Sequence, residues 1–196
     1  IAKKKPKTND LMKKEENIIQ VTITKPKLHR HEVKLKIGNW KKHFDLNYVN
    51  TIIAMALNYC SKNNAVFING YLITSQNLYL VIQTNEKHID TTVNKIEAQI
   101  IILLKNNRQK LKENRGEISF ITDDENLFYA ARKPLFKILP LENDHLVKLL
   151  TGKKVTLPYF DRDLESLKVV IHNHPFCSAI HYLGGIGPVE VTPLKD

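Results

Sequence analysis

The spacing of apolar residues changes along the chain from the period of a strand to that of a helix and back. Residues 33–37 alternate between apolar and basic side chains, which predicts a half-buried strand that Gly38 closes. From Asp45 onward the apolar residues recur at helical spacing, with Asp45 or Asn47 as the N-cap. The apolar face of this predicted helix comprises Leu46, Val49, Ile53, Ala56, Leu57 and Cys60.

A hairpin and a long helix follow in the same way. Residues 66–73 and 78–82 are predicted strands, joined by a turn at residues 75–77. Apolar residues at helical spacing then begin at Ile89, and the helix is expected to run through a basic segment and to stop by Gly116.

The remaining segments are shorter. We expect strands at residues 19–23 and 118–121, a short helix at 146–150, and a last helix that starts near Asp161 and ends before Pro175. Hairpins combined with helices predict an α+β fold, an antiparallel sheet flanked by helices. The expected organisation is a basic flexible tail at 1–16, a single domain at 17–181 and an irregular tail at 182–196.

Composition limits the class of protein. The chain of 196 residues is 42% hydrophobic, which is enough for a core. It contains no apolar run long enough to cross a membrane and no signal peptide, so no membrane partner is expected. Its two cysteines, Cys60 and Cys177, form neither a disulfide framework nor a CxxC motif, and we expect a cytoplasmic protein.

The formal net charge of +10 favours an anionic partner, most often nucleic acid. The alternative is a soluble basic protein without such a partner. Clustered cations suit phosphate contacts, which give affinity but little sequence specificity. The candidate nucleic-acid-binding residues are Lys25, Lys27, Arg30, Lys34, Lys36, Lys41, Lys42, Lys105, Arg108, Arg115, Arg132 and Lys133.

Other motifs do not indicate a site. Residues 151–154 read Thr-Gly-Lys-Lys but lack the upstream glycine of a phosphate-binding loop. The histidine pairs at 29/31 and 172/174 have the spacing of metal ligands. The first pair lies in a basic segment that would repel a cation, and the second lies at a helix end, where side chains two apart do not share a face. No metal site is therefore assigned.

The predicted hairpin carries an unusual polar pair. On a strand, residues two apart point to the same side, so Asn77 and Tyr79 face one side and Leu78, Leu80 and Ile82 face the other. Two histidines at positions 77 and 79 would make a good divalent-metal site. An amide and a neutral phenol are poor ligands.

This hairpin resembles that of the single-tyrosine transposases with the HUH fold, above all the REP-associated tyrosine transposases. In that family a turn commonly written M-P-N-H leads into a strand carrying His-hydrophobe-His. Thr74, Ser75, Gln76 and Asn77 stand at the turn, Leu78 is the hydrophobe and Tyr79 stands where the second histidine would be.

Two further segments are similar to the same family. Residues 114–120 resemble its N-R-x-G-x-L-F stretch. Residues 161–175 resemble its helix D-x-Y-L-x-x-L-x-x-Y-I-H-x-N-P, with Asp163 where the nucleophilic tyrosine would be. The residues of this helix that agree are Asp161, Leu164, Leu167, Ile171, His172 and Pro175.

The resemblance implies a small antiparallel sheet in a ferredoxin-like, HUH transposase-like arrangement. It also implies binding of single-stranded or hairpin DNA, for DNA transposition, by a monomer or homodimer. In the family a histidine pair holds Mg²⁺ or Mn²⁺ while a tyrosine attacks the phosphate. Asn77, Tyr79 and Asp163 replace those three groups, which indicates a catalytically degenerate relative without a cofactor.

Two alternatives remain open. One is an active, divergent DNA-nicking and joining transposase that uses Tyr159 or Tyr129 with Mg²⁺ or Mn²⁺. The other is a non-enzymatic α+β module that binds RNA or protein.

Overall fold

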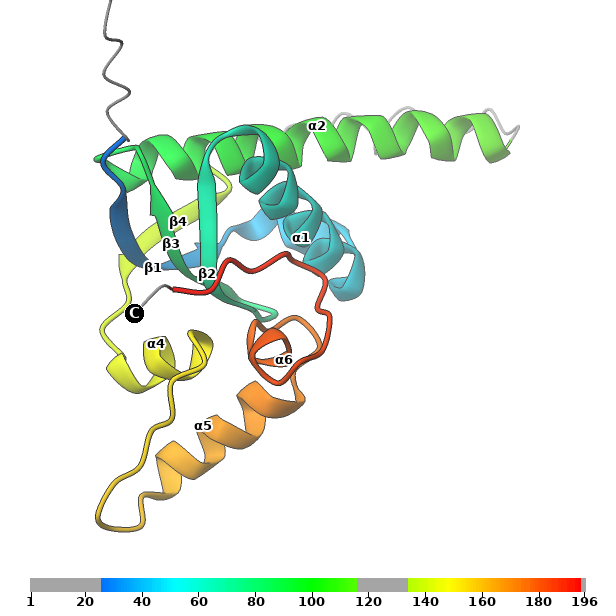
Figure 1. The fold of residues 1–196 in the computed structure, drawn as a ribbon. Helices are drawn as coiled ribbons and strands as arrows, with labels where there is room; N and C mark the ends of the chain where they lie inside the picture. Colours follow the sequence, from blue (N-terminus) through cyan, green and yellow to red (C-terminus); the bar gives the residue numbers. More distant parts are fainter. Residues whose placement is uncertain (1–25, 116–133, 195–196) are drawn as a thin grey trace, which may run out of the picture.

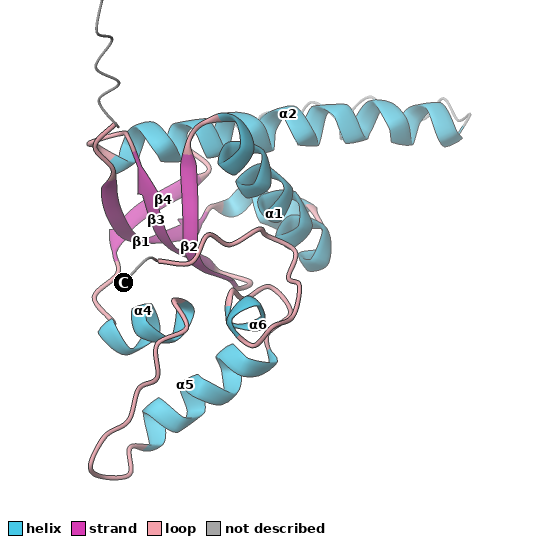
Figure 2. Cartoon of the chain, in the orientation of Figure 1, coloured by secondary structure: helices cyan, strands magenta, loops and turns pink. Residues whose placement is uncertain are grey.

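The part of the chain that the structure describes is built on an antiparallel sheet of four strands in the order β2-β3-β1-β4 (Figure 2). The computed structural model describes residues 26–115 and 134–194. The strands are β1 (His29–Ile37), β2 (Val66–Ile73), β3 (Asn77–Thr84) and β4 (Phe136–Pro140). Each neighbouring pair is antiparallel, which confirms the expected α+β class.

Two helices connect strands that are not neighbours in the sheet. α1 (Leu46–Asn63) links β1 to β2 with β3 between them, and α2 (Ile89–Arg115) precedes β4, with β1 between β3 and β4. Figure 1 shows α1 and α2 together on one side of the sheet, with α2 extending well past it. The alternation in β1 and β3 explains this arrangement, because the apolar side chains of both strands enter the core with these helices.

The main core confirms the sequence-based assignment of faces. Leu35, Leu78, Leu80 and Ile82 are fully buried in it. Asp45 is the N-cap of α1, since its Oδ1 accepts the backbone N–H of Asn47 at 2.8 Å. The choice between Asp45 and Asn47 is thereby decided.

A second layer of short helices covers part of the other side of the sheet. It consists of α4 (Asp144–Leu150), α5 (Arg162–Asn173) and α6 (Ala179–Tyr182) (Figure 1). α5 begins after its cap Asp161 and ends before Pro175, as predicted. α4 approaches β2 closely because Gly70 has no side chain: a Cβ there would lie 2.8 Å from the carbonyl oxygen of Leu150.

The segment after α5 extends the edge of the sheet at β2. Leu72 and Cys177 form an isolated antiparallel bridge, and Ile73 N donates to Phe176 O at 3.0 Å. Ser178, just before α6, contacts both β2 and α4. Its Oγ accepts the backbone N–H of Tyr71 at 3.0 Å and donates to the carbonyl oxygen of Leu150 at 2.7 Å. This contact ties α4 to β2.

Residues 183–194 form neither helix nor strand, yet they pack closely on the domain. Val189 is fully buried in the main core, and Thr192 N donates to Ile68 O at 2.7 Å. Figure 1 shows this red segment passing over β2. The tail is therefore part of the folded unit.

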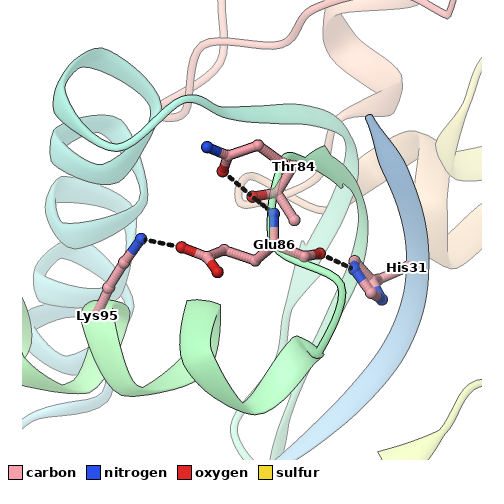
Figure 3. A network of polar contacts seen from close by, with 5 residues as sticks. His31, Thr84, Glu86 and Lys95 are labelled. Carbon is pink, nitrogen blue, oxygen red and sulfur yellow. Dashed lines mark hydrogen bonds and ion pairs between the residues drawn. The ribbon is translucent and has the colours of Figure 1, made fainter. Parts of the chain in front are cut away.

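The turn from β3 into α2 is held by polar contacts (Figure 3). The Glu86 carboxylate accepts from Lys95 Nζ at 2.7 Å, and the Glu86 carbonyl oxygen lies 3.0 Å from His31 Nε2. The Glu86 N–H donates to Thr84 Oγ1 at 3.3 Å. His31 therefore has a hydrogen-bond partner in this turn.

Some expectations lie outside the described residues, namely the tail at 1–16 and the strands at 19–23 and 118–121. Within the described ranges no helix is long and apolar enough to span a bilayer.

Candidate nucleic-acid interface

The side of the sheet opposite the main core carries a row of polar residues on three neighbouring strands. Lys36 of β1 lies opposite Asn77 of β3 and opposite Lys137 of β4. Two residues earlier on β1 and on the same face, Lys34 lies opposite Tyr79 of β3 and Leu139 of β4. Strand alternation places them together, because Val33, Leu35 and Ile37 occupy the core side of β1.

Asn77 and Tyr79 share this side of β3, as predicted. The Asn77 Nδ2 donates to the Tyr79 Oη across 3.5 Å. The Tyr79 ring packs against the second apolar cluster, which contains Leu72 of β2 and Leu146 of α4. The Nζ of Lys34 lies 5.8 Å from the centre of the Tyr79 ring, within the range of a cation–π contact.

The polar residues before β3 form the hairpin turn. The Thr74 hydroxyl accepts the backbone N–H of Asn77 at 3.0 Å. The same hydroxyl donates to the backbone carbonyl oxygen of Asn77, also at 3.0 Å. Such threonine turns explain the sequence Thr74–Asn77 without any ligand. The turn also offers the Ser75 carbonyl to Lys41, whose Nζ donates to it at 2.6 Å.

Lys41 adds further positive charge beside the turn. Its pKa is lowered, first by burial and then by the charges of Lys36 and Lys42. Lys36 and Lys42 are therefore near enough to Lys41 for their charges to disfavour its protonated form. We define the lysine patch as Lys34, Lys36, Lys41, Lys42 and Lys137.

The lysine patch has no acidic partner within the described residues. No Asp or Glu of these ranges forms an ion pair with any of its five members. The one acid of β1, Glu32, instead pairs with Arg30 at 2.7 Å. A cluster of unneutralised ammonium groups creates a positive potential that attracts phosphate.

Other candidate cations are not part of this patch. Lys27 is exposed ahead of β1, and Lys105 is exposed on α2, in the layer on the other side of the sheet. The candidate nucleic-acid-binding residues predicted from the sequence therefore do not all lie on one surface. The candidates that lie outside the described side chains are Lys25, Arg108, Arg115, Arg132 and Lys133, together with Tyr129.

Asp163 and Tyr159 come from α5 and from the loop before it. Asp163 is exposed in the first turn of α5 and makes no hydrogen bond or ion pair with Asn77 or Tyr79. Tyr159 is 65% exposed on the loop before α5. Among the side chains that the structure describes, no group of three metal-ligating His, Cys, Asp or Glu residues occurs.

Lys137 was missed by the sequence analysis because β4 was not predicted. The sequence pattern of β4 is short: Phe136 and Ile138 alternate with Lys137 before Pro140 ends the strand. Such a run of five residues is too brief to stand out. The tertiary structure adds it to the patch by pairing β4 with β1.

The chain was compared with known protein families, with curated proteins and with solved structures, and none of them matches.

Proposed function

We propose that this protein binds single-stranded or hairpin DNA and is a catalytically degenerate relative of the single-tyrosine transposases. The observation that carries the proposal is the position of Lys34, Lys36 and Lys137 of the lysine patch beside Asn77 and Tyr79, on the face of the sheet turned away from the main core.

The chemistry of this surface suits a flexible phosphate backbone. Lys36 and Lys137 are exposed and directly opposite each other, so two neighbouring phosphates can be contacted at once. Asn77 is half-buried beside them and offers an amide to a base edge. Because lysine contacts carry little sequence information, we expect binding that depends strongly on salt and weakly on sequence.

The connectivity of the sheet supports the same proposal. The order β1-α1-β2-β3-α2-β4, with the sheet order β2-β3-β1-β4, corresponds to a ferredoxin-like arrangement. This is the arrangement that the resemblance implies. It supports kinship in fold, whereas activity depends on the residues of the site.

The same residues argue against strand cleavage. In the sequence, Asn77 and Tyr79 stand where the resemblance implies a histidine pair, and neither is a good ligand for Mg²⁺ or Mn²⁺. Asp163, at the position of the implied nucleophile, is an anion that would repel a phosphate. We therefore propose DNA binding without nicking.

The test is binding of a fluorescent 20-nucleotide single strand and a hairpin by anisotropy, from low to moderate salt. We expect affinity for both DNAs to fall steeply with salt, and heparin of matched charge to compete less well than unlabelled DNA. Equal competition by heparin would contradict DNA as the partner.

A denaturing gel then tests the active alternative. With Mg²⁺ or Mn²⁺ present, we expect no covalent protein–DNA adduct. An adduct that disappears in Tyr159→Phe would instead establish cleavage through the exposed Tyr159.

A further inference from the structure

A pocket of about 600 Å³ lies among α4, α5 and α6, apart from the lysine patch. Its walls are mostly aliphatic and include Val155, Val169 and Leu183. Its volume is in the range of small-molecule sites. The function proposed above does not use it.

The charged residues of the pocket are all basic. Lys153 and Lys154 enter from the segment after α4, and Lys168 enters from α5. None of the lining residues is Asp or Glu. Lys168 pairs with Glu165 at 2.7 Å, but that pair is partly exposed and therefore weak enough to be shared with a ligand. An apolar wall with a cationic rim complements a molecule that has a flat apolar body and an anionic group.

The pocket is already formed by the packing of its neighbours. The ring of Tyr182 lies directly over Gly152, where a Cβ would come within 2.3 Å of it. The Tyr182 hydroxyl donates to Asn69 O at 2.6 Å, which fixes α6 against β2. Binding therefore requires little ordering of the protein, which favours a small ligand.

The pocket and the lysine patch are connected through one apolar cluster. Ile171 belongs to the second apolar cluster and also lines the pocket. Leu149 and Ala179, which line the pocket too, pack against this cluster, and Tyr79 packs against it from the sheet. The side of β3 that carries Tyr79 and the wall of the pocket thus share one apolar cluster.

We propose that this pocket is a nucleotide subsite, which takes one unpaired nucleotide with its base against Val169 and Leu183 and its phosphate at Lys154 and Lys168. The inference rests on the proposed function, because the bound DNA strand would supply the nucleotide. The chemistry it recognises, a base joined to a phosphate, is also present in a free mononucleotide.

The test uses methyl and amide NMR of the full chain with adenosine 5′-monophosphate, with adenosine, and with decanoate as an aliphatic anion. We expect saturable shifts of Val169 and Leu183 with the monophosphate, and binding of adenosine that is weaker by about tenfold or more. Equal binding of adenosine, tighter binding of decanoate or no saturable shift would each overturn the nucleotide subsite.

Two matched variants locate the site. Val169 and Val170 are adjacent on α5 and similarly exposed, 61% and 51%, but only Val169 lines the pocket. Val169→Trp should weaken binding of the monophosphate by about tenfold or more, and Val170→Trp should leave its affinity unchanged. Equal effects of the two variants would overturn the assignment of the site to this pocket.

A third variant tests recognition of the phosphate. Lys154→Gln, a milder exposed change, should remove the preference for the monophosphate over adenosine. An unchanged preference would show that the lysines at the rim of the pocket do not bind the phosphate.

A DNA titration separates this inference from the proposed function. If the monophosphate fails to bind while the single strand still binds with a steep salt dependence, the subsite is wrong and the proposed function stands. If the monophosphate binds at Val169 and no DNA binds, the subsite stands and the proposed function is wrong.

Discussion

The amide of Asn77 donates to the hydroxyl of Tyr79 across 3.5 Å, on the side of β3 that faces away from the main core. This distance is at the long limit for a hydrogen bond, so the contact contributes little to stability. The pair does, however, place two side chains side by side above a strand. The same geometry would serve two imidazoles.

We predict that the double substitution Asn77→His and Tyr79→His creates a site for a divalent metal. Imidazoles at these positions share a face and need no movement of the backbone. With Zn²⁺ as the probe, calorimetry should show binding at least about tenfold tighter than for Tyr79→His alone. Equal affinities would mean that β3 does not support a histidine pair.

The lysine patch predicts how the salt dependence of DNA binding changes. Lys36→Gln and Lys137→Gln should each lower the slope of log K against log salt by about 0.7, because each removes one phosphate contact to a single strand. Lys87→Gln is the control, since Lys87 is exposed beyond the opposite end of β3. If the control lowers the slope as much as the patch variants, binding is not localised on this face.

Two glycines with positive φ provide a matched test of the packing around α6. Gly152 has φ +74° and Gly184 has φ +85°, but only Gly152 lies against a neighbour, the Tyr182 ring. Gly184→Ala should cost about 1 kcal/mol, from the backbone conformation alone. Gly152→Ala adds the clash and should cost about 2–4 kcal/mol in urea unfolding. Equal costs would show that the Tyr182 contact is easily relieved.

His174 predicts a pH dependence of stability. Burial lowers the pKa of His174 below its ordinary value of 6.5, and its Nδ1 accepts the Phe176 N–H at 3.2 Å, which requires the unprotonated nitrogen. The folded state therefore binds this proton less readily than the unfolded state. The stabilisation is complete above pH 6.5 and is lost as the pH falls below that value, through the folded pKa.

The variant His174→Asn isolates this effect. An asparagine Oδ1 can accept the same N–H but does not titrate. The free energy of unfolding should fall less between pH 7 and pH 5 in the variant than in the wild type. Parallel pH profiles would assign the dependence to other groups.

Local patterns in the sequence are sufficient to predict most helices and strands within the described residues. The alternation of Leu78, Leu80 and Ile82 predicts which side of β3 enters the core, because a strand has only two sides. Asp45 and Asp161 mark the starts of α1 and α5, since a carboxylate satisfies the first backbone N–H groups of a helix.

The candidate site could be predicted only in part. The shared side of Asn77 and Tyr79 follows from their spacing, as do the positions of Lys34 and Lys36 on β1. The addition of Lys137 depends on the pairing of β4 with β1, and the exclusion of Lys105 depends on α2 lying on the opposite side of the sheet. Both facts depend on contacts between segments far apart in the chain.

The sequence by itself therefore determined most of the elements and their faces, whereas the tertiary structure decided which faces meet. Val189 shows the difference most clearly: it lies in a segment that forms neither helix nor strand, and yet it is fully buried in the main core. Its position depends on contacts such as that of Thr192 N with Ile68 O, which no local pattern encodes. The pocket beside α6 arises in the same way, from the packing of Tyr182 on Gly152.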